Sequence, residues 1–345
     1  MEKILSEENL KMAIKKVKQN KGAPGIDKMT VQEVEQWFEQ YREEIITQIM
    51  SKKYRPMPVK RVYIPKPNGK KRPLGIPTVV DRVIQQAISQ IITTIYEPIF
   101  SEHSYGFRPK RSAHMAMEEV LYYLNEGYEW IVDLDIEKFF DTVNHDKLIS
   151  ILRERVNDAT TLHLIRAYLR AGVLDDGLFK STTVGTPQGG PISVILSNIY
   201  LDKFDKELES RNLRFVRYAD DSIILVKSEM SANRVMKSVT TWLERKLFLK
   251  VSATKTKVVR PTEGQFLGFT FYKNIGEWKC VPTKDRKKRL YTKIKKFMKR
   301  KHAVSRALSI TFTKVNQIVR DENSYWEVLK LYKPVKYEVT MDKLF

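Results

Sequence analysis

Apolar residues recur along this chain with two periodicities, about 3.6 residues, which is typical of helices, and two residues, which is typical of strands. Residues 1–50 keep the helical spacing except at 21–25, where glycine and proline predict a loop. Residues 78–96 place valine, alanine and isoleucine on one helical face, behind a threonine suited to cap the helix. Two more helices are predicted, one starting near His145 and one over 231–248 with an apolar stripe.

Other segments carry the strand pattern and the turn signals that bound strands. Residues 59–64 and 72–76 flank a loop that contains Asn-Gly, the strongest short signal for a hairpin. Residues 213–218 and 222–227 are apolar runs joined by a short acidic turn, which predicts a second hairpin, and 130–136 predicts a further strand. Hairpins interspersed with helices indicate an α+β fold.

The composition indicates what kind of partner the protein binds. With 345 residues, 42% of them hydrophobic, the chain can bury a sizeable core and is long enough for roughly two domains. Lysine and arginine number 62 against 41 acidic residues, which gives a formal net charge of +21. A soluble protein this cationic usually meets a polyanion, most often nucleic acid. The alternative, a membrane surface, needs an amphipathic basic helix or a lipid anchor.

Residues 281–306 concentrate this charge, with 12 Lys/Arg and a single acidic residue. Leu290 and Ile294 recur at helical spacing within the segment, so it is predicted to be a helix with an apolar stripe and a cationic back. Such a helix can lie along a phosphate backbone, and Lys288 and Lys295 are predicted to contact nucleic acid there.

Cysteine usage and hydropathy exclude several classes of protein. The lone Cys280 rules out an intrachain disulfide framework and a cysteine-based zinc site. The N-terminus lacks the apolar core of a signal peptide, and no uninterrupted apolar run approaches the ~18 residues of a membrane-spanning helix. The sequence therefore predicts a soluble protein with no membrane partner, cytoplasmic if its source is a bacterium.

Two pairs of acidic residues lie on strands that are otherwise apolar. Asp133 and Asp135 occupy alternate positions of the strand 130–136, so both can face one side of a sheet. Asp220 and Asp221 form the tip of the second hairpin. Carboxylates gathered on a core sheet repel one another and lose hydration unless a cation neutralises them. Oxygen ligands of this kind suit Mg²⁺, and two such ions form the clamp of phosphoryl-transfer enzymes, whether nuclease or polymerase.

Sequence blocks around these acids resemble a known family. Tyr218-Ala219-Asp220-Asp221 is similar to the YxDD box of reverse transcriptases. Further blocks that resemble the fingers and palm motifs occur in the family's order at 64–77, 104–109, 135–141, 186–191, 255–257 and 266–269. Together they resemble bacterial group II intron-encoded reverse transcriptases and their free-standing relatives, over about residues 20–272.

The resemblance implies a right-hand polymerase of fingers, palm and thumb, in which an antiparallel palm sheet packs on helices. It places an N-terminal extension and the fingers at 1–125, and the palm with its carboxylates at 126–262, with a helical insertion at about 142–180. Residues 263–345 would then be a basic helical thumb with an incomplete maturase-like region. Residues 20–27 resemble the lid that contacts the template in that family.

Carried onto the matching positions, the resemblance assigns a catalytic centre. Asp135, Asp220 and Asp221 would act as catalytic carboxylates. Together with the main-chain carbonyl of Ile136 they would hold two Mg²⁺ ions, for which Mn²⁺ could substitute. Those ions would lower the pKa of the primer 3′-hydroxyl and neutralise the leaving pyrophosphate. Lys255 matches a lysine beside the triphosphate and is a candidate general acid.

The same resemblance assigns the incoming nucleotide to further positions. Lys66 and Arg72, on the two arms of the fingers hairpin, would hold the triphosphate, the arginine with a bidentate fork and the lysine as a point charge. Phe140 would place an aromatic ring under the sugar and exclude a 2′-hydroxyl, which selects deoxynucleotides. Gln188 and Gly189 would pack beneath the template base and the nucleotide, where glycine permits close backbone approach.

Basic residues outside this centre are expected to meet the template. Lys70 and Lys71 lie near the tip of the fingers hairpin, where template backbone or solvent is expected. Arg108 would contact the template or the nucleotide, or would form a structural salt bridge instead.

The function predicted from the sequence is that of an RNA-directed DNA polymerase that copies RNA, and also DNA, templates into DNA. Its partners would be an RNA template, a DNA or RNA primer and deoxynucleoside triphosphates, with a group II intron RNA and a homodimer left open. One alternative is an RNA-binding intron maturase with a vestigial polymerase site, and another is a domesticated reverse transcriptase in phage defence. Phe140 disfavours an RNA-templated RNA polymerase. The chain ends at Phe345, short of a full maturase domain, and carries no Cys/His endonuclease motif.

Overall fold

The computed structural model of the chain describes residues 1–65, 69, 71–175, 177–185, 189–298, 309–310 and 313–318. Its helices are α1 (Glu2–Leu5), α2 (Glu7–Gln19), α3 (Val34–Met50), α4 (Val79–Tyr96), α5 (Ala113–Asn125), α6 (Phe139–Thr142), α7 (His145–Arg153), α8 (Ala159–Arg170), α9 (Pro191–Ser210), α10 (Glu229–Lys246) and α11 (Lys284–Phe297), with a 3₁₀ turn at Glu97–Ile99. Residues 309–310 and 313–318 are also helical. Its strands are β1 (Val59–Pro65), β2 (Lys71–Ile76), β3 (Trp130–Leu134), β4 (Val173–Asp175), β5 (Leu178–Lys180), β6 (Arg214–Tyr218), β7 (Asp221–Val226), β8 (Lys257–Val259), β9 (Gln265–Phe266), β10 (Phe269–Asn274) and β11 (Glu277–Pro282).

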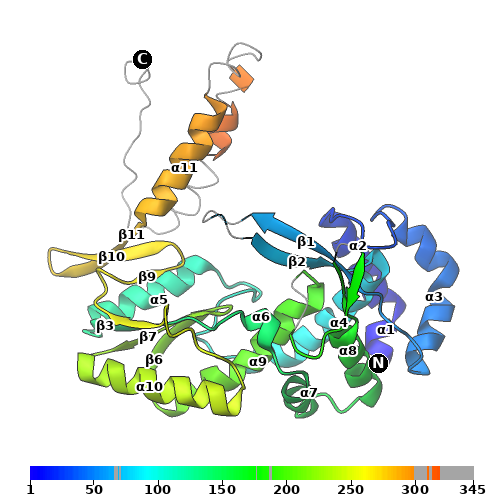
Figure 1. Cartoon of the computed structure of the whole chain (residues 1–345), viewed down its shortest axis with the longest axis horizontal. Helices are drawn as coiled ribbons and strands as arrows, with labels where there is room; N and C mark the ends of the chain where they lie inside the picture. Colours follow the sequence, from blue (N-terminus) through cyan, green and yellow to red (C-terminus); the bar gives the residue numbers. More distant parts are fainter. Residues whose placement is uncertain are drawn as a thin grey trace.

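Helices α1 to α4 and the β1–β2 hairpin form the fingers end of the molecule, and the palm sheet lies at the other end (Figure 1). Helix α4 is held by its apolar face, on which Val83, Ala87 and Ile88 are completely buried. The Thr78 hydroxyl accepts a hydrogen bond from the Asp81 amide at 3.1 Å, so the predicted N-cap is confirmed. The predicted mixture of helices and hairpins is confirmed as an α+β fold.

The fingers sheet contains the first predicted hairpin and one strand pair that was not predicted. Strands β1 and β2 pair antiparallel, with Pro65 opposite Lys71. Strand β4 joins the other edge of β1 as a parallel neighbour, and the sheet order is β2-β1-β4-β5. Residues 142–180, predicted as a helical insertion in the palm, therefore contain α7, α8 and two strands that extend the fingers sheet.

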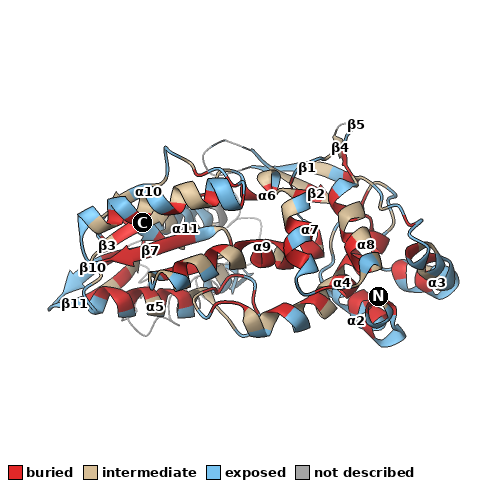
Figure 2. Ribbon diagram, turned by 90° about the horizontal axis from the view of Figure 1, so that it is seen from below, coloured by how far each residue is buried: buried red, intermediate tan, exposed pale blue. Residues whose placement is uncertain are grey.

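The palm sheet has the order β6-β7-β3-β8, and all its neighbouring strands are antiparallel. Figure 2 shows the buried strands β3 and β7 between α10 on one side and α5 on the other. The period of two divides the strands between two apolar clusters. Val132 and Leu134 pack with residues of α9 and α10, whereas Ile131 packs with α5. Asp133 lies two residues after Ile131 and therefore on the same face of β3. Acidic and apolar residues thus alternate along the strand as predicted.

A three-stranded sheet of order β11-β10-β9 follows the palm, where the sequence analysis placed the start of a basic helical thumb. Phe269 and Phe271 on one strand, and Trp278 and Cys280 on the next, are buried at alternate positions and pack over α5. A turn at 275–276, with positive φ at both residues, joins the two strands. These strands were not predicted, because the segment was interpreted through a family motif rather than through its period of two.

The predicted basic helix is present as α11, which rises from the palm on the same side as the β1–β2 hairpin (Figure 1). It begins after Thr283, whose hydroxyl accepts a hydrogen bond from the Arg286 amide. Leu290 and Ile294 are half-buried along the predicted apolar stripe. No helix among the described residues is long and apolar enough to cross a membrane.

Candidate active site

The tip of the β6–β7 hairpin carries the first pair of acids. Tyr218 pairs with Asp221, so Ala219 and Asp220 form a two-residue turn. Ala219 has a φ of 60°, a left-handed conformation that is unfavourable for a residue with a Cβ. Such conformations persist where the surrounding structure over-determines them. The turn is therefore fixed by its surroundings rather than by its own backbone preference.

Asp135 reaches the same edge of the sheet from the neighbouring strand. Strand β3 ends with Leu134 paired to Ser222 of β7, which brings the next residue, Asp135, beside the hairpin tip. The Asp135 amide donates to the Thr256 hydroxyl at 3.2 Å, and its carbonyl accepts from the Ser252 amide at 2.9 Å. Strand pairing thus assembles acids that are far apart in the sequence.

The gathered carboxylates repel one another. Asp221 opens onto a cleft whose protein walls strip part of its hydration, and this desolvation, followed by the charges of Asp220 and Asp135, raises the pKa of Asp221 to about 6. Burial likewise raises the pKa of Asp133, with a further contribution from Asp135. Clustered oxygen donors whose charge is incompletely neutralised fit a divalent cation.

Across the described parts of the chain, no three His, Cys, Asp or Glu side chains lie close enough to enclose a metal ion by themselves. The carboxylates at the edge of the palm sheet supply oxygen donors, the ligands that hard divalent cations take, and substrate phosphates can complete such a site. The residues present therefore fit the divalent metals that the resemblance implies.

Lys255 neutralises part of the acidic charge. Its Nζ lies 3.0 Å from both carboxylate oxygens of Asp135. The lysine side chain is 68% exposed, so water screens this pair. Ile136, whose carbonyl is a predicted ligand, is buried next to Asp135 and bridges Val251. The predicted catalytic and metal-binding residues therefore gather at one edge of the palm sheet.

A cleft of about 660 Å³ opens in front of the hairpin tip, within the ~300–1,000 Å³ that ligand pockets usually offer. Its walls include Arg72 from the fingers, Phe140 from α6, Gly189 before α9, and Asp220 and Asp221 from the hairpin. Residues predicted from four separate sequence blocks for nucleotide binding or catalysis thus share one cavity.

Phe140 is held in place by its neighbour. It is 9% exposed and lines the cleft, and its ring packs edge-on against that of Phe139 with centroids 5.3 Å apart. Phe139 is 1% exposed and also contacts the ring of Tyr200. The first phenylalanine of the pair is therefore a core residue, and the second presents a fixed ring to the cleft, as a steric gate requires.

The fingers hairpin brings Arg72 to the cleft from β2. Lys71, the preceding residue, is exposed on the same strand. Lys66 and Lys70, the other predicted contacts of this hairpin, lie outside the described residues.

Gly189 packs closely against the fingers. Its φ is 121°, and an added Cβ would lie 2.3 Å from the carbonyl oxygen of Gly75 on β2. A side chain at this position would collide with the backbone of β2, which explains the glycine through the fold. Its predicted packing beneath the template base and the nucleotide stays a prediction. Gln188, its predicted partner, lies outside the described residues.

Arg108 does not face the cleft. Its side chain is buried, and Nε donates to the Glu97 carboxylate at 3.0 Å while Nη1 donates to the carbonyls of Ser101 and Ser104. The guanidinium also lies over the ring of Phe100, 5.3 Å from its centroid. Of the two roles considered for Arg108, the structural salt bridge is correct and the contact with template or nucleotide is wrong, because its donors are already engaged inside the protein.

Lys288 and Lys295 are exposed on α11, away from the cleft walls. The Thr292 hydroxyl donates to the carbonyl of Lys288, as is usual one turn along a helix. A contact between these lysines and a nucleic acid backbone stays a prediction.

Arg82 also lines the cleft, although no role was predicted for this residue from the sequence. It is 8% exposed, and its Nη2 donates to the carbonyl of Ala23 at 2.7 Å. An added Cβ at Gly22 would lie 2.4 Å from Nη1 of Arg82. The arginine thus ties the predicted lid to α4. An arginine inside the apolar helix 78–96 was a signal that could have indicated it.

Comparison with known proteins agrees with this geometry. Residues 64–271 match the family described as reverse transcriptase (RNA-dependent DNA polymerase). Protein YkfC of Escherichia coli (strain K12) is 35% identical over 278 residues, which cover 68% of this chain and 73% of YkfC. The group II intron-encoded protein LtrA of Lactococcus lactis subsp. cremoris is 41% identical over 181 residues, which cover 52% of this chain and 30% of LtrA. Among solved structures, a partial Cas6-RT-Cas1–Cas2 complex covers 70% of this chain and 42% of the matched chain, with a TM-score of 0.44 and 24% identity.

The site and the fold define a nucleic acid polymerase of the right-hand class. The chain belongs to the reverse transcriptase family, in the branch related to group II intron-encoded proteins. Its enzyme class is RNA-directed DNA polymerase, which acts on a nucleic acid template and deoxynucleoside triphosphates with divalent metals. The match to LtrA spans 30% of LtrA, so most of that protein has no counterpart in the matched region.

Proposed function

We propose that this chain extends a DNA or RNA primer by copying RNA, and also DNA, into DNA, with Mg²⁺ as its metal and Mn²⁺ as a substitute. The observation that carries the proposal is that Asp135, just after β3, meets Asp220 and Asp221 of the β6–β7 hairpin, which line a cleft together with Arg72 and Phe140. A protein that only binds RNA gains nothing from carboxylates that repel the phosphate backbone.

The acids at the sheet edge supply the metal ligands. Asp135, Asp220 and Asp221, with the carbonyl of Ile136, would hold the ions, which when bound lower the pKa of the primer 3′-hydroxyl and offset the charge of the leaving pyrophosphate. Nζ of Lys255 lies 3.0 Å from the Asp135 oxygens and is exposed, so it would be the general acid beside the leaving pyrophosphate.

The walls of the cleft select and orient the nucleotide. Arg72 donates to the triphosphate through its planar fork. The fixed ring of Phe140 lies under the sugar and leaves no room for a 2′-hydroxyl. The predicted lid, residues 20–27, is held to α4 by Arg82 and contributes Asn20 and Gly22 to the cleft, where it would contact the template.

Primer extension on a defined RNA template tests the proposal directly. With Mg²⁺ and four deoxynucleotides, the wild-type chain should extend a labelled DNA primer to full length, and the new strand should resist alkali as DNA does. A chain that binds the duplex without extending the primer under Mg²⁺ or Mn²⁺ would contradict the proposal and favour the maturase alternative, with a group II intron RNA as partner.

Helix α11 is expected to hold the duplex by phosphate contacts. Replacing Lys288 and Lys295 together by alanine should weaken binding about equally for all sequences, because phosphates carry no sequence information. It should also reduce the slope of log K against log salt by about 2, since each phosphate contact contributes about 0.9. Fluorescence anisotropy with a labelled RNA–DNA duplex at several salt concentrations measures both effects.

A matched pair of lysines provides the control for this prediction. Lys237 and Lys246 are exposed on α10, which lies on the opposite side of the palm from α11 (Figure 1). Their double alanine variant has the same net charge as the α11 variant and should keep the wild-type salt slope. Equal slopes for all three proteins would contradict a duplex contact by α11.

A further inference from the structure

A buried ion pair lies directly behind the catalytic hairpin. Arg217 of β6 and Asp205 of α9 have side chains that are 1% and 0% exposed. Nε of Arg217 donates to Oδ1 of Asp205 at 2.7 Å, and Nη2 donates to Oδ2 at 2.5 Å. The free energy that a buried ion pair gains from attraction is largely offset by the free energy of removing both charges from water. Stability alone is therefore a weak explanation for this pair.

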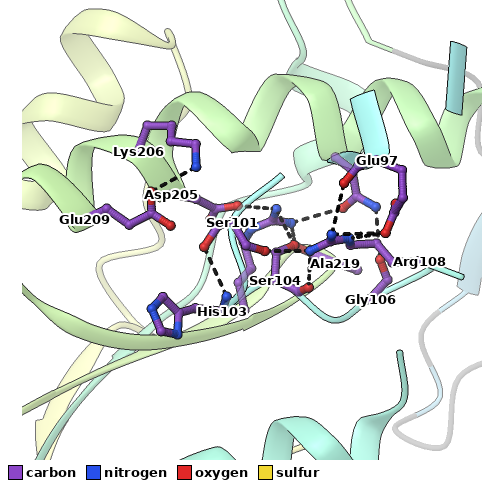
Figure 3. Close-up of polar contacts among 12 residues, drawn as sticks. Glu97, Ser101, His103, Ser104, Gly106, Arg108, Asp205, Lys206, Glu209 and Ala219 are labelled. Carbon is purple, nitrogen blue, oxygen red and sulfur yellow. Dashed lines mark hydrogen bonds and ion pairs between the residues drawn. The ribbon is translucent and has the colours of Figure 1, made fainter. Parts of the chain in front are cut away.

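The remaining donors of Arg217 reach the hairpin turn and its supports. Nη1 donates to the carbonyl of Ala219 at 2.8 Å and to Oδ1 of Asn198 at 3.1 Å. Nη2 also donates to the Ser104 hydroxyl at 2.7 Å. Figure 3 shows polar contacts in this region, with Asp205, Ser104 and Ala219 labelled among the residues drawn. Ala219 is the turn residue with the unfavourable left-handed backbone.

A second contact closes the turn from the side. An added Cβ at Gly106 would lie 2.2 Å from the amide nitrogen of Ala219, so the 104–107 loop touches the turn backbone to backbone. The Gly106 carbonyl accepts a hydrogen bond from Nδ2 of Asn198 at 2.9 Å. Asn198 therefore joins the loop to Arg217, and the strained residue is held from two directions by one network.

We propose that Arg217 is a positioning residue for the polymerase reaction. Through the Ala219 carbonyl it holds the turn in its left-handed conformation, and it thereby fixes Asp220 at the edge of the sheet to which Asp135 also belongs. Asp205 orients the guanidinium so that Nη1 points at that carbonyl. Arginine is needed because its planar fork can bind a carboxylate and a carbonyl at fixed angles, whereas lysine offers a single rotating ammonium.

Arg217→Lys separates charge from geometry. The variant keeps a cation opposite Asp205, so no lone carboxylate is buried, but it loses the fork. Amide hydrogen exchange at residues 219–221 should become at least about 10-fold faster, while exchange in β3 stays unchanged. The kcat for primer extension should fall about 100-fold, the cost of a small misplacement of reacting groups, with the KM for the deoxynucleotide within about threefold of wild type.

A double variant covers the case in which Arg217→Lys does not fold. Arg217→Met with Asp205→Val removes both charges at similar total volume, which proteins often tolerate. It should show the same faster exchange at the turn and the same loss of kcat. Tyr54→Phe serves as a control for general destabilisation, because it removes a 2.8 Å hydrogen bond to the buried Asp81 in the fingers. It should lower Tm and leave exchange at 219–221 unchanged.

The two readouts separate this inference from the proposed function on which it rests. Wild-type exchange at the turn in the folded Arg217→Lys or double variant would overturn the positioning role. Faster exchange together with an unchanged kcat would also overturn it, because the hold on the turn would then not position a reacting group. A wild-type chain that extends no primer would instead contradict the proposed function.

Discussion

Replacing Asp220 by asparagine is expected to reduce primer extension by at least about 10³-fold, the scale on which enzymes lose activity when a preorganised electrostatic contact to the transition state is removed. The variant should still bind primer–template, and its Tm should be no lower than that of wild type. Asp220 is the first charge among those that raise the pKa of Asp221, so removing it relieves repulsion in the protein without metal. Single-turnover extension, duplex anisotropy and thermal unfolding measure the three quantities.

Asp146→Asn is the matched control. Asp146 lies on α7, where its exposed carboxylate pairs with Arg166 at 2.7 Å and does not line the cleft. Its asparagine variant should extend primers at the wild-type rate. If Asp220→Asn retained extension within tenfold of wild type, Asp220 would not be a metal ligand in the reaction.

Replacing Phe140 by alanine is expected to raise the incorporation of ribonucleotides relative to deoxynucleotides by about 100-fold, the scale on which a single pocket group discriminates between substrates. The ring lines the cleft with little freedom to move, so its removal opens space where a 2′-hydroxyl would lie. Loss of the buried ring should also destabilise the protein by about 3 kcal/mol. Competition between the two nucleotide types on one RNA template measures the selectivity.

Phe139→Leu distinguishes selectivity from destabilisation. Phe139 is the adjoining ring, 1% exposed, and it does not line the cleft. Its leucine variant should be less stable than wild type but equally selective for the sugar. A Phe140→Ala variant that still rejects ribonucleotides would remove the steric gate from this account.

Elements with a strong local signal could be predicted from the sequence. The cap at Thr78, the Asn-Gly hairpin and the acidic hairpin turn each depend on residues within a few positions of one another. The meeting of Asp135 with Asp220 depends on the pairing of β3 with β7, which local pattern does not determine. Family motif order supplied that part of the prediction.

The residues that were misjudged have partners set by tertiary structure. Arg72 and Arg108 look alike in the sequence, yet one reaches the cleft and the other is enclosed by backbone carbonyls of its own loop. Arg217 lies two residues after the buried Phe215, on the same face of β6, and a charge at such a position needs a buried partner. The partner, Asp205, lies on a helix twelve residues away, and only the fold brings the two together.

Asp135 and the acids of the β6–β7 hairpin are proposed to form a two-metal polymerase site. Anomalous diffraction from crystals of the chain with primer–template, a non-hydrolysable deoxynucleotide and Mn²⁺ tests this assignment. We expect two manganese peaks about 3.5–4 Å apart, in contact with oxygens of Asp135 and Asp220 and with the triphosphate. Manganese bound away from these carboxylates, with Lys255 still paired to Asp135 in the complex, would contradict it.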